Sequence, residues 1–96
     1  MKIVTMDFTG VEYIGQVHLI LTEALDFPEW YGKNLDALWD LLTGYIEPCI
    51  INIKGLREVS KELTQYMQKV VNILLEAEKT YNRIQINFID EPKNYF

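Results

Sequence analysis

Alternating apolar residues predict three β-strands in this chain. The predicted strands are Ile3–Phe8, Cys49–Ile53 and Arg83–Ile89. Every second side chain of an extended backbone points to the same side, so alternation indicates a strand with one buried face. β-branched residues, which dominate the second segment, favour the same conformation. Thr9-Gly10 and Lys54-Gly55 then turn the chain after the first two strands.

Apolar residues at helical spacing predict helices between these strands. The first is expected over Gln16–Leu25, with Gly15 as a permissive cap. Further helices are expected over Leu35–Thr43, over Leu56–Leu63 as a short piece, and over Tyr66–Lys79 as the longest. The apolar side of the longest helix consists of Met67, Val70, Val71, Leu74 and Leu75.

This order of elements predicts an α/β fold. Strands that alternate with pairs of helices imply parallel strands joined by right-handed crossovers. With the strands side by side in the order 1-2-3, both crossovers place their helices on one face of the sheet. The apolar residues of that face are Val4, Met6, Phe8, Cys49, Ile51, Ile53, Ile84, Ile86 and Phe88. We therefore expect a two-layer domain, a three-stranded parallel sheet with helices packed on one face, over residues 1–96, with residues 90–96 as a C-terminal tail.

The helix over Leu35–Thr43 is clearly bounded by its sequence. Asn34 can cap the first turn by accepting a backbone N–H, and Gly44 can adopt the left-handed conformation that ends a helix. At 100° per residue, its apolar side consists of Leu35, Leu38, Leu41 and Leu42. The outward side consists of Asp36, Asp40 and Thr43, with Trp39 at the border.

The acidic charge of the chain is concentrated around this helix. The segment Glu23–Glu47 holds six acids and one base, Lys33, and its net charge of −5 equals that of the whole chain. Asp36 and Asp40 repel each other across one helical turn by about 0.2–0.5 kcal/mol, and no Lys or Arg lies between Asn34 and Ile53. Such a local field favours a cationic partner and argues against nucleic acid as a ligand.

Aromatic residues gather in the same segment. Trp30, Tyr31, Trp39 and Tyr45 lie close together in the sequence, and Pro28 marks a constrained loop before the helix. Rings beside carboxylates are typical of protein interfaces, because rings supply contact area and carboxylates supply orientation. Packing in the core is the alternative for each ring, and we expect it for Tyr31.

The composition indicates a soluble globular domain. The chain has 96 residues, 49% of them hydrophobic and 24% charged, and no apolar run long enough to span a membrane. The acidic residue Asp7 interrupts the N-terminal segment before an apolar region of signal-peptide length can form, so we expect a cytoplasmic protein. One cysteine excludes an intrachain disulfide, and Cys49 with His18 alone argues against a structural zinc site. We expect Cys49 and His18 to have packing roles.

The segment from Pro28 to Tyr45 resembles the barstar family of ribonuclease inhibitors. Its sequence is PEWYGKNLDALWDLLTGY, and looser similarity extends to Val17-His18, Pro48 and Leu75-Glu76-Ala77. This sequence has Trp30 where the best-known form of the motif has Tyr, Tyr45 where it has Trp, and a turn before Cys49 that is one residue shorter.

The resemblance implies the same two-layer α/β fold and a cytoplasmic inhibitor, monomeric when free, of a basic, secreted, barnase-like ribonuclease. A ribonuclease active site binds phosphate and is cationic, so an inhibitor needs carboxylates where phosphates would lie. The predicted partner-binding residues are Trp30, Asn34, Asp36, Trp39, Asp40, Thr43, Gly44, Tyr45, Glu47 and, at the periphery, Glu76.

Two other functions fit parts of the sequence. An enzyme could use Asp36 and Asp40 as an acid/base pair, with or without His18, but an exposed helix face lacks the desolvation that would separate the pKa values of two carboxyl groups. No nucleophile or metal motif accompanies them, so we expect no enzymatic activity, no cofactor and no metal. The second alternative is an immunity or regulatory protein of the same fold whose target is not a ribonuclease.

Overall fold

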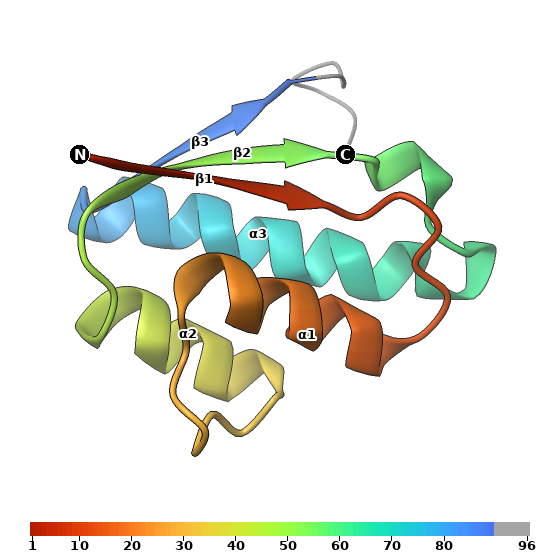
Figure 1. Ribbon diagram of the computed structural model, residues 1–96, viewed down its shortest axis with the longest axis horizontal. Helices are drawn as coiled ribbons and strands as arrows, with labels where there is room; N and C mark the ends of the chain where they lie inside the picture. Colours follow the sequence, from red (N-terminus) through yellow and green to blue (C-terminus); the bar gives the residue numbers. More distant parts are fainter. Residues whose placement is uncertain (90–96) are drawn as a thin grey trace.

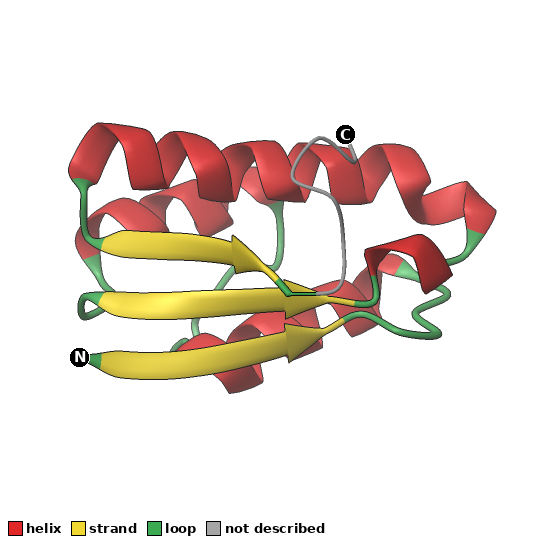
Figure 2. Cartoon of the chain, turned by 90° about the horizontal axis from the view of Figure 1, so that it is seen from above, coloured by secondary structure: helices red, strands yellow, loops and turns green. Residues whose placement is uncertain are grey.

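Three parallel strands form the sheet in the predicted order. The computed structural model describes residues 1–89, and the strands are β1 (Lys2–Asp7), β2 (Cys49–Lys54) and β3 (Ile84–Phe88), arranged β1-β2-β3. The sheet register places Met6 opposite Ile53 and Ile53 opposite Phe88, so apolar side chains align across all three strands. Figure 2 shows the strands side by side in one open sheet. The predicted fold class is confirmed.

The helices cover one face of this sheet, as expected. They are α1 (Ile14–Leu25), α2 (Leu35–Gly44) and α3 (Thr64–Tyr81). Helices α1 and α3 lie next to the sheet, whereas α2 packs chiefly against α3 and lies farther from the strands (Figure 1). Helix α2 is therefore an outlying element with one side against the protein and the other open to solvent.

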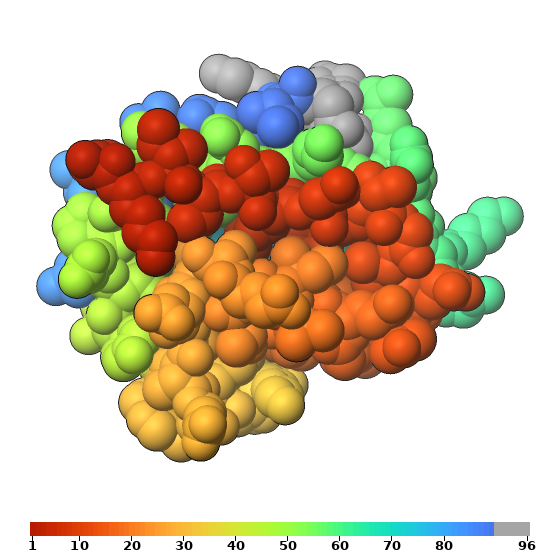
Figure 3. Space-filling model, viewed as in Figure 1, coloured from red at the N-terminus to blue at the C-terminus, as the bar shows by residue number. Residues whose placement is uncertain are grey.

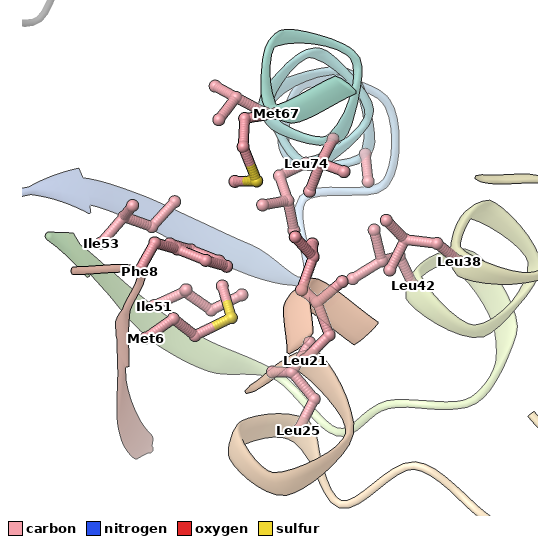
Figure 4. Packing of buried hydrophobic residues seen from close by; sticks show 14 of the residues in the cluster. Met6, Phe8, Leu21, Leu25, Leu38, Leu42, Ile51, Ile53, Met67 and Leu74 are labelled. Atoms are coloured by element: carbon pink, nitrogen blue, oxygen red, sulfur yellow. The ribbon is translucent and has the colours of Figure 1, made fainter. Parts of the chain in front are cut away.

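Side chains from the sheet and all three helices form one core. Met6, Ile51 and Ile53 of the strands extend toward Leu21 of α1 and toward Met67 and Leu74 of α3 (Figure 4). Phe8, predicted as the last residue of the first strand, follows the end of β1 and packs in the same cluster. Leu38 and Leu42 enter the same cluster from α2 and are fully buried. Full burial of a leucine side chain contributes about 1.5–3 kcal/mol, so the apolar side of α2 fixes the orientation of its outer side.

The bounds of helices α1 and α3 differ from the prediction. Helix α1 begins at Ile14, not Gln16, because the Gln16 side chain accepts the backbone N–H groups of Glu12 and Tyr13 at 2.7 and 3.3 Å and so caps the start. Gly15 accordingly lies inside the helix. Helix α3 is also longer at both ends than the predicted Tyr66–Lys79.

The predicted short helix over Leu56–Leu63 is instead two separate 3₁₀ turns, Leu56–Glu58 and Lys61–Leu63. Two backbone hydrogen bonds explain the break, since Gly10 N–H donates to Glu58 O and Ser60 N–H donates to Val11 O. These bonds hold the segment against the β1–α1 connection, and Val59, between the two turns, has an extended backbone.

One apolar assignment in α3 is also wrong. Leu75 is 36% exposed, whereas Met67, Val70, Val71, Leu74 and Ala77 are buried. Leu75 lies 100° around the helix from Leu74 and so falls beside the core-facing side. The predicted tail, residues 90–96, lies outside the described residues. No helix in residues 1–89 is both long and apolar enough to cross a membrane.

Candidate functional site

Helix α2 starts with the predicted cap. The Asn34 side-chain oxygen accepts the Ala37 N–H at 2.8 Å, and the amide Nδ2 donates to Gly32 O at 3.3 Å. Lys33 immediately before it adopts the left-handed conformation, with φ of 55°. Asn34 therefore joins the preceding loop to the helix, and the positive end of the helix dipole lies next to Asp36 in the first turn.

The end of α2 differs from the prediction. Gly44 is the last helical residue and has no positive φ; Tyr45 follows it in a right-handed conformation. The N–H groups of Tyr45 and Ile46 both donate to Leu41 O, at 3.0 and 3.1 Å, so backbone bonds complete the last turn without a left-handed residue. A Cβ atom on Gly44 would meet nothing within 4 Å. The free fold therefore does not require glycine at this exposed position.

Asp36 and Asp40 lie exposed on the outer side of α2. Neither carboxylate forms an ion pair with a base in residues 1–89; the ion pair found there joins Lys54 Nζ to Asp7 Oδ2, at 3.9 Å and on the sheet. The two acids thus remain available to a cationic partner, while their mutual repulsion is not relieved within the described protein.

An exposed ring pair joins the two ends of the α2 region. Trp30, from the loop before the helix, and Tyr45, just after it, meet edge to face with centroids 6.0 Å apart and an interplanar angle of 86°. Trp30 is 71% exposed and Tyr45 is 47% exposed. The loop between α1 and α2 forms a protrusion at the lower edge of the space-filling view (Figure 3). Neither ring is buried in the core, the alternative considered for both from the sequence.

A second ring pair connects α2 with the end of α3. Trp39, partly buried, meets Tyr81 edge to face at a centroid distance of 5.9 Å, and Tyr81 is 46% exposed. Tyr81 was not among the predicted site residues. The sequence does give one signal, an aromatic residue at the end of a long helix, but not that α3 ends beside α2. We call Asp36, Asp40 and the two ring pairs the α2 surface.

The other predicted residues lie around this surface. Thr43 donates its hydroxyl proton to Trp39 O at 2.8 Å, so only the oxygen lone pairs of Thr43 can serve a partner. Glu47 is exposed and, with Tyr45, lines a pocket of about 190 Å³ that also includes Lys2 and Asp26. Glu76 is exposed on α3, the helix against which α2 packs. The peptide bond before Pro48 is trans, since residues 1–89 contain no cis bond.

His18 lies beneath the loop that carries Trp30. Its side chain is 1% exposed, and its Nδ1 and Nε2 atoms hydrogen-bond the hydroxyls of Tyr31, at 2.7 Å, and Tyr66, at 2.6 Å. Burial lowers the pKa of His18, and the nearby Lys33 ammonium lowers it further. Burial also raises the pKa values of both tyrosines, so the cluster is neutral at pH 7.

The buried His18 predicts a loss of stability in mild acid. The unfolded chain takes up a proton as pH falls through about 6.5, whereas the folded protein takes it up only at lower pH. The free energy of unfolding should therefore be unaffected by His18 above pH 6.5 and fall by up to about 1.4 kcal/mol per pH unit below it, until the folded pKa is passed. Urea unfolding at pH 7.5 and 5.5 measures this, and the pH dependence should shrink in His18→Asn.

Residues 1–89 contain no group of three or more His, Cys, Asp or Glu side chains that could hold a metal ion. Cys49, predicted to be a core residue, is buried, and burial raises the pKa of its thiol. The exposed chemistry around α2 is therefore that of carboxylates and aromatic rings, a combination suited to contact with another protein.

The chain is similar to known proteins in both its family pattern and its overall sequence. A family model described as Barstar (barnase inhibitor) matches residues 1–90. The chain is also 36% identical over 80 residues to the protein named "Putative ribonuclease inhibitor YrdF" of Bacillus subtilis (strain 168), covering 82% of this chain and 88% of that protein. The three-stranded parallel sheet with helices on one face agrees with the α/β fold of the family. The chain belongs to the barstar family.

Proposed function

We propose that this protein inhibits a basic, barnase-like secreted ribonuclease by covering its active site with the α2 surface, within the cell that produces the enzyme. The observation that carries the proposal is the exposed pair Asp36 and Asp40, which no base in residues 1–89 neutralises. Family membership and the name of the Bacillus subtilis relative support a ribonuclease as the class of target.

The proposed mechanism is replacement of phosphates by carboxylates. A ribonuclease holds the phosphates of RNA with cationic side chains, and carboxylates form the same charge-assisted hydrogen bonds with arginine and lysine. Asp36 and Asp40 lie one helical turn apart, a rise of about 6 Å, which is similar to the spacing of neighbouring phosphates along a strand. Leu38 and Leu42 are buried on the opposite side and hold this pair in a fixed orientation.

The ring pairs would surround the charged contact. Trp30 and Tyr45 form one ring pair with exposed apolar area. Trp39 and Tyr81 form the other, in which Tyr81 supplies exposed area. Rings that exclude water around a charged contact make that contact stronger. Gly44 lies exposed with open space above it, which would let the backbone of a partner approach closely.

An immunity or regulatory protein with a different basic target is the second candidate. This chain has Trp30 and Tyr45 where the best-known form of the family pattern has Tyr and Trp. Because both rings are exposed, this exchange favours a partner that differs from barnase. We do not propose an enzyme, since Asp36 and Asp40 are exposed to water on a helix face. Titrating a purified barnase-type ribonuclease with the protein, with RNA cleavage as the readout, separates the candidates; full inhibition at one-to-one stoichiometry supports the first.

We also expect fast association that depends strongly on salt. The net charge of −5 within Glu23–Glu47 would attract a basic enzyme over distances that salt screens, with a Debye length of about 10 Å at 0.1 M. Stopped-flow measurements should show the association rate constant falling at least tenfold between 10 and 500 mM salt. An association rate that does not change with salt would contradict approach through the acidic segment.

A further inference from the structure

The loop before α2 is held in an unusual way. Residues 26–34 contain two left-handed residues, Asp26 and Lys33, and no regular helix or strand. The Phe27 N–H donates to Thr22 O at 3.1 Å, and the Tyr31 N–H donates to Pro28 O at 3.0 Å. These bonds fix the start and the turn of the loop locally, but neither attaches its middle to a helix.

Tyr31 makes that attachment. Its ring packs on Phe27 with centroids 4.7 Å apart, and its side chain is buried while the neighbouring Trp30 is exposed. The Tyr31 hydroxyl is hydrogen-bonded to His18 Nδ1 on α1. His18 is the only buried polar or charged residue within residues 1–89, so a polar side chain is kept in the core where an apolar one could pack.

The opposite nitrogen of His18 is also bonded. Nε2 meets the Tyr66 hydroxyl on α3, and a neutral imidazole has one N–H donor and one acceptor nitrogen. One tyrosine therefore donates to the ring while the other accepts from it, and the bond to Tyr66 holds the orientation of the His18 ring. The chain Tyr66–His18–Tyr31 thus links α3, α1 and the loop through two directional bonds.

We propose that His18 is a positioning residue for partner binding, which holds Tyr31 so that Trp30 stands against Tyr45 before a partner arrives. This inference rests on the proposed function. A loop that is already ordered loses less conformational entropy on binding, so the complex is tighter and dissociates more slowly. The hydrogen bond to Tyr31 performs the positioning, and the bond to Tyr66 supports it.

Two substitutions at the same position separate these bonds. His18→Asn places an amide group where Nδ1 lies and can keep the bond to Tyr31, whereas His18→Gln places one where Nε2 lies and can keep the bond to Tyr66. Amide hydrogen exchange of the Tyr31 N–H in the free, full-length protein reports on the loop. We expect exchange at least tenfold faster in His18→Gln than in His18→Asn, with Ile53→Val, a core substitution on the sheet, exchanging like the parent. Equal rates in the two His18 variants would overturn the proposal.

A second pair of substitutions tests the same proposal if the His18 variants do not fold. Tyr31→Phe and Tyr66→Phe each remove one oxygen and leave the ring in place, and the Tyr31 variant should show the faster loop exchange and at least tenfold faster dissociation from the ribonuclease. Equal exchange in this pair would also overturn the role of His18. If the parent binds no ribonuclease, the proposed function fails, but the exchange rates of the free proteins still decide whether His18 positions the loop.

Discussion

Replacing Asp40 with alanine is expected to abolish most of the inhibition while leaving the fold intact. Asp40 lies in the middle of the exposed side of α2, between Asp36 and the rings at the helix end. Losing one partner of a charge pair that is enclosed in a complex costs about 2–5 kcal/mol, which corresponds to roughly 30- to several thousand-fold weaker binding. The inhibition constant of the variant against a barnase-type ribonuclease measures this.

Thermal melts should show that the Asp40→Ala protein folds as stably as the parent. Because Asp40→Ala removes one member of a repelling pair, the melting temperature of the free protein should stay the same or rise slightly. Glu23→Ala is the matched control, since it removes an exposed acid of the same segment but from α1. It should slow association modestly and leave dissociation unchanged. An Asp40→Ala protein that inhibits as well as the parent would contradict the proposed mode of binding.

Gly55→Ala is expected to destabilise the fold strongly. Gly55 has φ of 81°, and a Cβ atom there would lie 2.4 Å from the Thr9 backbone N and 2.8 Å from Asp7 Oδ1. The Thr9 N–H donates to that same carboxylate at 3.0 Å, and the hydrogen bonds from Thr9 lower the pKa of Asp7. Left-handed strain costs about 1–2 kcal/mol and the backbone clash adds to it, so we expect a loss of roughly 3 kcal/mol or more.

Gly10→Ala distinguishes the cost of left-handed backbone strain from the cost of a steric clash. Gly10 also has a positive φ, of 78°, but a Cβ atom there would meet nothing within 4 Å. It should cost only the strain of about 1–2 kcal/mol, so its melting temperature should lie between those of the parent and Gly55→Ala. If the two alanine variants melt together, the close packing of the β2 end against the turn after β1 does not determine stability.

The sheet could be predicted because its pattern is simple. Strands with an apolar residue at every second position have one buried face, and the right-handed crossover rule leaves few topologies for three of them. The register follows from the same alternation, as Ile51 between Val4 and Ile86 illustrates. Helix ends were less predictable, because they depend on single hydrogen bonds. The Gln16 side chain accepts two backbone N–H groups, so α1 begins earlier than predicted. Two backbone hydrogen bonds to Leu41 O complete the end of α2, so Gly44 does not need a left-handed conformation.

The local geometry of the α2 region could be predicted where it is continuous in sequence, whereas contacts between distant segments could not. Asn34 caps α2 as its local sequence indicated. Tyr81, by contrast, reaches Trp39 only because α3 packs along α2. The bonds of His18 to Tyr31 and Tyr66 likewise join residues 13 and 48 positions apart, and no local pattern specifies such pairs. The sequence indicated a packed histidine but not which groups it would hold.

We propose that the α2 surface is the face that meets the ribonuclease. Amide hydrogen exchange of the full-length protein, measured free and saturated with a barnase-type ribonuclease, tests it most directly. We expect slower exchange in the complex over residues 29–47 and at the end of α3 near Tyr81, with strand β1 unchanged. Slower exchange confined to β1 or to the outer face of the sheet, with residues 29–47 unaffected, would contradict the account.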